Sequence, residues 1–127
     1  MRNCAFVVLS GLLSACSAAH SATPDSRNPA NCIAAFNYGA YWFKLDHNER
    51  GVRNMRVRGS YEMAKWKADG RSKDEAISEA KKITELYAKN DAAMDALFKA
   101  CGSAQDSDPN FARAQVEIIA AMNSAAR

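Results

Sequence analysis

The chain has 127 residues, with 17 lysines and arginines against 14 aspartates and glutamates, so its formal net charge is +3. Once the predicted export signal is removed, this length leaves one domain with a modest core and is too short for a second domain. The positive balance is too mild to indicate a polyanionic partner by itself.

The first fifteen residues have the pattern of a bacterial signal peptide. Arg2 gives a positive start, and residues 5–15 form an apolar run that is too short to span a bilayer as a mature helix. The run ends in Leu-Ser-Ala-Cys at residues 13–16, which matches a lipobox, in which the cysteine receives a lipid. Ser17 follows where the inner-membrane retention signal has aspartate. The sequence therefore predicts a periplasmic lipoprotein, anchored to the outer membrane through Cys16.

Two alternatives to lipidation stay open. Ordinary cleavage after Ala19 or near Ala22 would discard Cys16, and Cys16 could also form a disulfide. Residues 16–28 are small and polar and include a proline, so they are expected to form a flexible tether. Residues 29–127 then form the folded domain.

The first predicted helix opens at Asn28-Pro29, because asparagine can cap a helix and proline tolerates the first position. Residues 32–45 are apolar nearly all round, which predicts a central, buried helix. The alternative is that part of this surface meets a partner. Residues 46–51 break the pattern, and a second helix is predicted from Glu49 or Val52 to Ala68.

The third predicted helix begins with a capping box at residues 72–75, and Asn90-Asp91 marks a fresh cap or a kink. The fourth helix is expected to end at Gly102, before a polar loop over residues 103–108. Asp108-Pro109 opens the last helix, whose expected buried stripe is Phe111, Ala114, Gln115, Ile118, Ile119 and Met122. No stretch alternates with period two for long enough to be a strand. We therefore predict an all-α bundle of four to five helices.

Four cysteines are present. Cys4 falls in the leader and Cys16 at the lipobox, so Cys32 and Cys101 remain for the domain and are predicted to form one disulfide in an oxidising compartment. These two cysteines lie far apart and no Cys-x-x-Cys spacing occurs, so we expect no metal site and no cofactor.

No catalytic motif is apparent. The predicted domain contains one histidine, His47, and it falls in a loop. Neither a Ser-His-Asp set nor a His-x-x-Glu motif is present, and the carboxylates of residues 74–79 are interspersed with lysines as on a solvated face. We therefore expect a protein that is not an enzyme.

Charge is distributed unevenly along the chain. Residues 50–73 carry eight lysines and arginines against two acidic residues, a net of +6, while residues 74–117 have a net of −4. A basic face attracts an acidic protein partner. Anionic lipid headgroups or lipid A phosphates are a second possible target of the basic face. The alternative is that this face is an ordinary solvated surface without a binding role. The predicted compartment argues against a nucleic-acid partner. The predicted partner-binding residues are Arg53, Arg56 and Arg58, with an exposed aromatic anchor from Tyr38, Tyr41 and Trp42.

The export signal, the helical pattern and the Cys32/Cys101 pair together resemble the small periplasmic immunity proteins that neutralise amidase effectors of type VI secretion. The resemblance covers residues 32–127 in architecture, transfers no motif residue by residue, and departs from many such proteins in having a lipobox. It implies an inhibitor that plugs the active-site cleft of a hydrolase. The alternative is an accessory or structural lipoprotein of an envelope assembly or secretion machine, and a homodimer stays open.

Lipidation at Cys16 is directly testable. Metabolic labelling with palmitate should mark the wild-type protein strongly, and Cys16→Ser should abolish the label, because only the thiol accepts the acyl group. A mature N-terminus anywhere between residues 18 and 23 in the wild type would contradict the lipobox interpretation.

Overall fold

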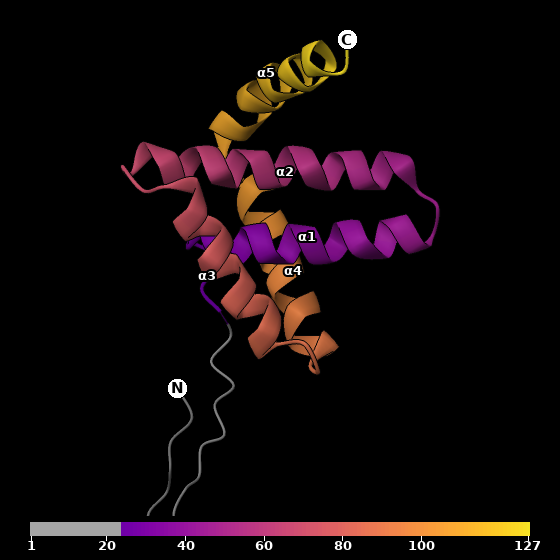
Figure 1. Cartoon of the computed structure of the whole chain (residues 1–127), viewed down its shortest axis with the longest axis vertical. Coiled ribbons are helices and arrows are strands. Elements are labelled where there is room, and N and C mark those ends of the chain that lie inside the picture. Colours follow the sequence, from indigo (N-terminus) through magenta and orange to yellow (C-terminus); the bar gives the residue numbers. More distant parts are fainter. Residues whose placement is uncertain (1–23) are drawn as a thin grey trace, which may run out of the picture.

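A computed structural model describes residues 24–127, so the predicted signal peptide, the Cys16 anchor and most of the tether lie outside the described residues. The described part is an all-α bundle, which confirms the predicted fold class (Figure 1). Its helices are α1 (Pro29–Leu45), α2 (Glu49–Ala68), α3 (Lys73–Leu86), α4 (Asp91–Asp106) and α5 (Pro109–Ala125).

Helix α1 is the centre of the bundle. Asn28 caps it by accepting a 3.0 Å hydrogen bond from the backbone N–H of Ala30, and Pro29 occupies the first helical position, as predicted. Residues 30–36 are all buried, and α1 packs against α2, α3 and α4 (Figure 1). The prediction of a central, buried helix is therefore confirmed for the first half of α1. Its second half is largely exposed.

Helices α1 and α2 form an antiparallel hairpin (Figure 1). His47 adopts a left-handed conformation with φ of 55° in the short turn, and Asn48 then caps α2 through a 2.8 Å hydrogen bond from the N–H of Gly51. Gly51 also allows close packing, because a Cβ there would lie 2.5 Å from the ring of Phe43. The turn and this glycine together hold the hairpin closed at its end.

The predicted capping box at the start of α3 is confirmed. Ser72 Oγ accepts a hydrogen bond from the N–H of Glu75, and the Glu75 carboxylate accepts one from the N–H of Ser72. Trp66 of α2 is 1% exposed, and its indole Nε1 donates a 2.8 Å hydrogen bond to the Ser72 carbonyl. This tryptophan packs in one core cluster with Ala76 and Ala80 of α3. The start of α3 is thereby fixed to the end of α2.

The predicted disulfide joins Cys32 of α1 to Cys101 of α4. Both cysteines are buried, their Cα atoms are 5.5 Å apart, and they belong to the core cluster that contains Phe36 and Leu97. The bond therefore links the central helix covalently to a helix 69 residues further along the chain.

The predicted end of the fourth helix was wrong. Gly102 does not stop α4, which continues to Asp106, so most of the expected polar loop over residues 103–108 is helical. The reason is Gln105, which is buried and donates hydrogen bonds to the Glu62 carboxylate at 2.7 Å and to the Arg58 carbonyl at 3.0 Å. These bonds to α2 stabilise the last turn by more than a helical glycine costs, about 1 kcal/mol.

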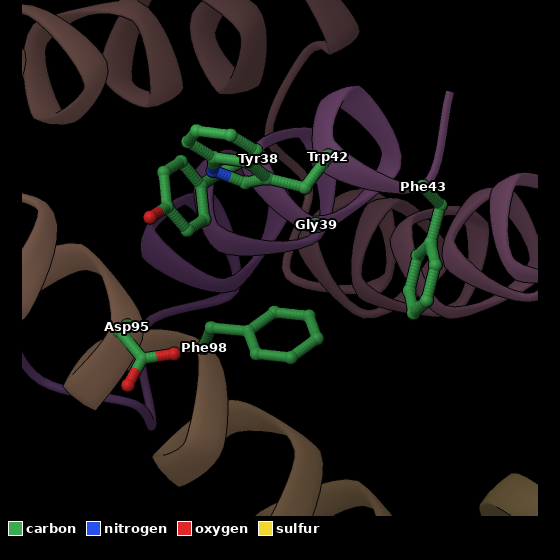
Figure 2. Close-up of a pocket in the computed structure, with 6 residues that line it drawn as sticks. All are labelled: Tyr38, Gly39, Trp42, Phe43, Asp95 and Phe98. Atoms are coloured by element: carbon green, nitrogen blue, oxygen red, sulfur yellow. The ribbon is translucent and has the colours of Figure 1, made fainter. Parts of the chain in front are cut away.

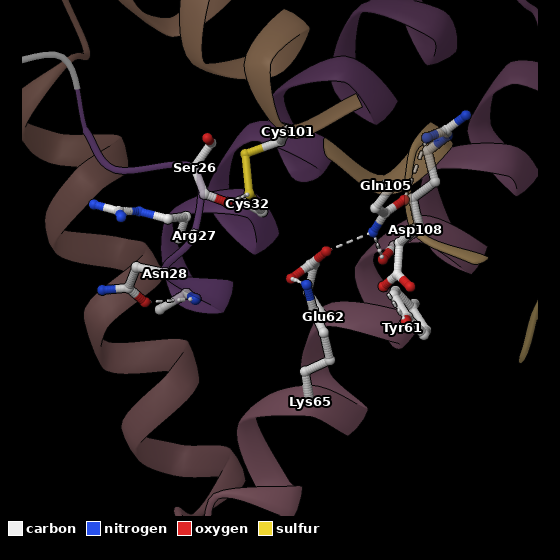
Figure 3. A network of polar contacts seen from close by, with 12 residues as sticks. Ser26, Arg27, Asn28, Cys32, Tyr61, Glu62, Lys65, Cys101, Gln105 and Asp108 are labelled. Atoms are coloured by element: carbon white, nitrogen blue, oxygen red, sulfur yellow. Dashed lines mark hydrogen bonds and ion pairs between the residues drawn. A yellow bond between two sulfur atoms is a disulfide. The ribbon is translucent and has the colours of Figure 1, made fainter. Parts of the chain in front are cut away.

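Glu62 is a buried carboxylate that the sequence pattern did not reveal (Figure 3). Its side chain is 1% exposed, and its two oxygens lie 2.7 Å from Gln105 Nε2 and 2.8 Å from Lys65 Nζ. A buried carboxylate is costly unless it is paired and hydrogen-bonded, and here it has both partners. The polar cluster thus fixes the relative positions of α2 and α4.

Helix α5 is less buried than its sequence predicts. Asp108 and Pro109 open it as expected, but Phe111 is its only fully buried residue within the described chain, and the rest of the predicted stripe is half-buried. The physical reason is its position, because α5 packs mainly against α2, with a smaller contact to α4, and no further helix of the described chain covers it (Figure 1). One residue of α5, Val116, is 70% exposed.

Loss of the disulfide should destabilise the fold strongly. A Cys32→Ala/Cys101→Ala double variant should lose about 4 kcal/mol of unfolding free energy, because the bond removes the entropy of a loop of 69 residues from the unfolded chain. Urea denaturation of the variant and the wild type measures this difference. An unchanged denaturation midpoint would show that the bond does not form.

Candidate partner-binding site

Exposed aromatic side chains cover the second half of α1. Tyr41 is 58% exposed and Trp42 is 45% exposed, whereas Phe36, one to two turns earlier, is buried. Tyr38 and Phe43 are half-buried between these extremes. Large aromatic side chains at a protein surface are characteristic of interfaces, because they bury much area at little entropic cost. The structure therefore places the predicted aromatic anchors where a partner can reach them.

A hollow between α1 and α4, which we term the aromatic pocket, is lined by three of the aromatic residues of α1, Tyr38, Trp42 and Phe43 (Figure 2). Its volume is about 260 Å³. Tyr38 and Trp42 come from α1, with ring centroids 6.0 Å apart and planes inclined at 77°, while the facing wall comes from α4. The lining residues are Tyr38, Gly39, Trp42, Phe43, Asp95 and Phe98.

Gly39 gives the aromatic pocket its floor. A Cβ at this position would lie 2.5 Å from Cε2 of Phe98 and 3.1 Å from Sδ of Met55. The glycine therefore allows the Phe98 ring to lie directly against the backbone of α1, at the cost of some helix stability. Phe98 also makes an edge-to-face contact with Phe36, with centroids 6.2 Å apart.

A second hollow, which we term the arginine groove, lies between α2 and α5 and has a volume of about 520 Å³. Arg50 and Arg53 line it from α2, and Ile119 lines it from α5. Phe43 lines both hollows, so the groove and the aromatic pocket adjoin at this ring. The remaining lining residues of the groove are Asn48, Gly51, Asn54, Val57 and Gln115.

The three predicted arginines have different environments. Arg53 is exposed and donates a hydrogen bond to Asn123 of α5, and Arg56 is exposed one helical turn further along α2. Arg58 has a side chain only 15% exposed, 2.8 Å from the carboxylate of Asp106 and 5.2 Å from the ring centroid of Phe111. Arg53 and Arg56 thus lie at the surface, whereas Arg58 joins α2 to α4 and α5.

The exposed charges of α2 differ from those of α3. On α3, Lys82 pairs with Glu79 at 2.7 Å and Lys81 approaches Glu85 at 3.8 Å, so these charges offset one another locally. Within residues 24–127, no ion pair joins a carboxylate to Arg50, Arg53 or Arg56. Their positive charge is therefore available to an acidic partner.

A hydrogen bond between Tyr61 and Asp108 fixes where α5 begins (Figure 3). The Tyr61 hydroxyl donates to Asp108 Oδ2 at 2.5 Å, while Asp108 Oδ1 caps α5 by accepting from the N–H of Asn110 at 2.9 Å. Burial is the largest cause, and this hydrogen bond the second, of a rise in the pKa of Tyr61 to about 12. The same hydrogen bond lowers the pKa of Asp108. One carboxylate therefore both starts α5 and ties it to α2, which sets the far wall of the groove.

Several lining residues were missed by the sequence analysis. Phe43 was expected in the core, and Arg50 was counted only as part of the basic stretch. Asp95 and Phe98 were not connected with the aromatic residues of α1 at all. The spacing of Phe98 and Asp95 on α4 was visible in the sequence, but only the packing of α4 against α1 brings them to the pocket.

A metal site requires a group of ligating side chains, and a membrane-spanning helix requires length and apolar character. His47 is exposed in the hairpin turn, and residues 24–127 contain no group of three or more histidine, cysteine or acidic side chains arranged to hold a metal ion. No helix in this part of the chain combines the length and apolar character needed to cross a bilayer. Comparisons with protein-family models, curated proteins and solved structures give no match.

The Tyr61–Asp108 hydrogen bond should make stability depend on alkaline pH. The folded protein raises the pKa of Tyr61 from 10 to about 12. The protonated Tyr61 side chain therefore contributes its full share of the unfolding free energy below pH 10, and this share is lost as the pH rises towards 12. Tyr61→Phe should cost about 1 kcal/mol at pH 8 and should lose less stability than the wild type between pH 8 and pH 11.

Urea denaturation at the two pH values measures both effects, with Tyr41→Phe as a control because the Tyr41 side chain is exposed. Parallel losses in the wild type and in Tyr61→Phe would mean that Tyr61 is not responsible for the alkaline dependence.

Proposed function

We propose that this protein is a non-enzymatic binding protein of the bacterial envelope that inhibits a secreted hydrolase, such as a peptidoglycan amidase. The surface that docks is the end of the α1–α2 hairpin, with the aromatic pocket on one side of Phe43 and the arginine groove on the other. The observation that carries the proposal is that one hairpin has exposed Tyr41 and Trp42 on α1 and exposed arginines on α2, Arg50, Arg53 and Arg56, which have no carboxylate partner among residues 24–127.

The aromatic residues supply affinity. Tyr41 and Trp42 are in contact with each other, with centroids 5.6 Å apart and ring planes at 74°, so their rings form one continuous aromatic patch. Burying such a patch in a partner releases water from a large apolar area and orders few torsions. Truncation of a central anchor of this kind typically costs 2 kcal/mol or more.

The arginines supply orientation and rate of encounter. Arg53 and Arg56 lie about one turn apart on the exposed side of α2, and their planar guanidinium groups can pair with carboxylates in a bidentate manner. Exposed charges of this kind chiefly change the association rate and its salt dependence. The partner is therefore expected to have an acidic region beside the cleft that the hairpin enters.

The shape of the hairpin supports inhibition by blocking a cleft. The joined ends of α1 and α2 extend beyond α3 and α4 (Figure 1), so this end can enter a concave surface without a clash from the rest of the bundle. At this end of the hairpin Asn48 caps α2 and Gly51 packs closely against the Phe43 ring, and a preformed end lowers the entropic cost of inserting it. A lipid on Cys16 would hold the inhibitor at the outer membrane, where an incoming hydrolase meets it.

An accessory role in an envelope assembly or secretion machine is the second candidate. The observation in its favour is α5, which leaves Val116 exposed and Ile118, Ile119 and Met122 half-buried. A helix with an incompletely covered apolar stripe can be completed by another protein or by a second copy of the chain. The inhibitor function thus predicts that the end of the hairpin binds the partner, whereas the accessory function predicts that α5 does.

Site-specific photo-crosslinking in the native bacterium distinguishes these functions. A photo-reactive amino acid at Tyr41 should capture a secreted hydrolase, whose activity on purified peptidoglycan should fall as the purified protein is added. Trp42→Ala should weaken this inhibition at least tenfold, and Arg53→Glu should reduce the association rate most at low salt.

Matched controls are a crosslinker at Lys81 and the variant Glu79→Gln, both on α3, which should leave capture and inhibition unchanged. Capture of a secretion-machine component through position 116 of α5, with nothing at position 41, would favour the accessory role. A hydrolase that is bound but not inhibited would contradict the proposal.

A further inference from the structure

We infer that the aromatic pocket receives a cationic side chain, lysine or arginine, from a protein partner, with Asp95 as its counter-charge. The existence of such a partner rests on the proposed function, whereas the preference of the pocket for a cation is a property of this chain alone. The partner would then have two opposite features, an acidic region for the arginine groove and a protruding basic side chain for the pocket.

The walls of the pocket suit a cation. Tyr38, Trp42, Phe43 and Phe98 contribute four aromatic rings, and the rings of Tyr38 and Trp42 are nearly perpendicular, which lines the hollow on more than one side (Figure 2). The faces of aromatic rings carry partial negative charge, so they attract lysine and arginine groups within about 6 Å. The methylene stem of such a side chain also packs well on the apolar surface between the rings.

Asp95 supplies the formal charge. It lines the pocket from α4, as Phe98 does (Figure 2). Its carboxylate is 2.8 Å from Nζ of Lys99. Both side chains of this pair are at least half exposed, so the ion pair is weak and easily exchanged. A cation entering the pocket would take the place of Lys99 and would gain the rings as additional partners.

The same chemistry already operates elsewhere in the molecule. The guanidinium of Arg71 lies 3.4 Å from the ring centroid of Trp66, and Nζ of Lys65 lies 5.3 Å from that of Tyr61 while it pairs with the Glu62 carboxylate. The second case combines a ring and a carboxylate around one ammonium group, which is the arrangement inferred for the pocket. In the aromatic pocket, the cationic group would come from the partner protein.

Other occupants fit the pocket less well. An anion would face the Asp95 carboxylate and the negative ring faces. A neutral apolar side chain would fill the space between the rings but would remove water from Asp95 without giving it a new partner. A cationic side chain satisfies both the rings and the carboxylate, so it is the occupant that the lining favours.

The two tryptophans of the chain provide the readout. The indole N–H resonance of Trp42, in the pocket, and that of Trp66, buried against α3, can be followed separately by NMR on the purified protein. N-acetyl-lysine amide and N-acetyl-arginine amide should shift the Trp42 signal and leave Trp66 unchanged. N-acetyl-norleucine amide, which has a similar length without the charge, should bind at least about threefold more weakly.

Substitutions around the carboxylate sharpen the test. Asp95→Asn should weaken binding of both cationic probes about threefold or more, while Lys99→Gln should strengthen it, because the internal competitor is gone. The matched control is Asp91→Asn at the start of α4, which should change nothing. A merely structural role of Asp95 would not give a gain of binding in Lys99→Gln.

Equal binding of the norleucine probe, or unchanged binding in both Asp95→Asn and Lys99→Gln, would overturn the inference. A Trp42 response to phosphocholine with none to lysine or arginine would also overturn it, in favour of a lipid headgroup. These measurements need no hydrolase, so they can fail while the inhibition assay succeeds, or succeed while it fails.

Discussion

The fold depends on the complete burial of the first half of α1. Seven consecutive residues, 30–36, are out of solvent, which is achievable only when other helices surround that segment on all sides. Helices α2, α3 and α4 fulfil this condition, and the bond between Cys32 and Cys101 holds the arrangement from within. Small residues at positions 30, 34 and 35 allow the close approach of the neighbouring helices.

The candidate site follows from the part of α1 that this core does not enclose. Beyond Gly39 the helix continues past α3 and α4 with the same apolar composition, and only α2 of the described helices stays beside it, so its aromatic residues reach the surface. Gly39 and Gly51 then let Phe98 and Phe43 lie directly on helix backbones, which shapes the hollow beneath Trp42. One helix thus forms the centre of the core in its first half and the proposed recognition surface in its second half.

Polar contacts between distant helices set the other half of the surface. Glu62 and Gln105 join α2 to α4, and Tyr61 and Asp108 place the start of α5. Arg58 belongs to this internal set, because it approaches Asp106 and the ring of Phe111. The arginines of α2 therefore lie on different faces of the helix. Arg58 stabilises the fold, while Arg50 and Arg53 line the arginine groove.

The sequence by itself determined the helical class, the starts of α1, α3 and α5 and the pairing of Cys32 with Cys101. Caps such as Ser72 with Glu75 are readable because both partners lie within one turn, so no distant contact is needed. Only the tertiary structure decided the length of α4, the internal role of Arg58 and the placement of Asp95 and Trp42 on the walls of one pocket. Each of these depends on contacts across more than forty residues, such as the one between Gln105 and Glu62, and local periodicity carries no information about them.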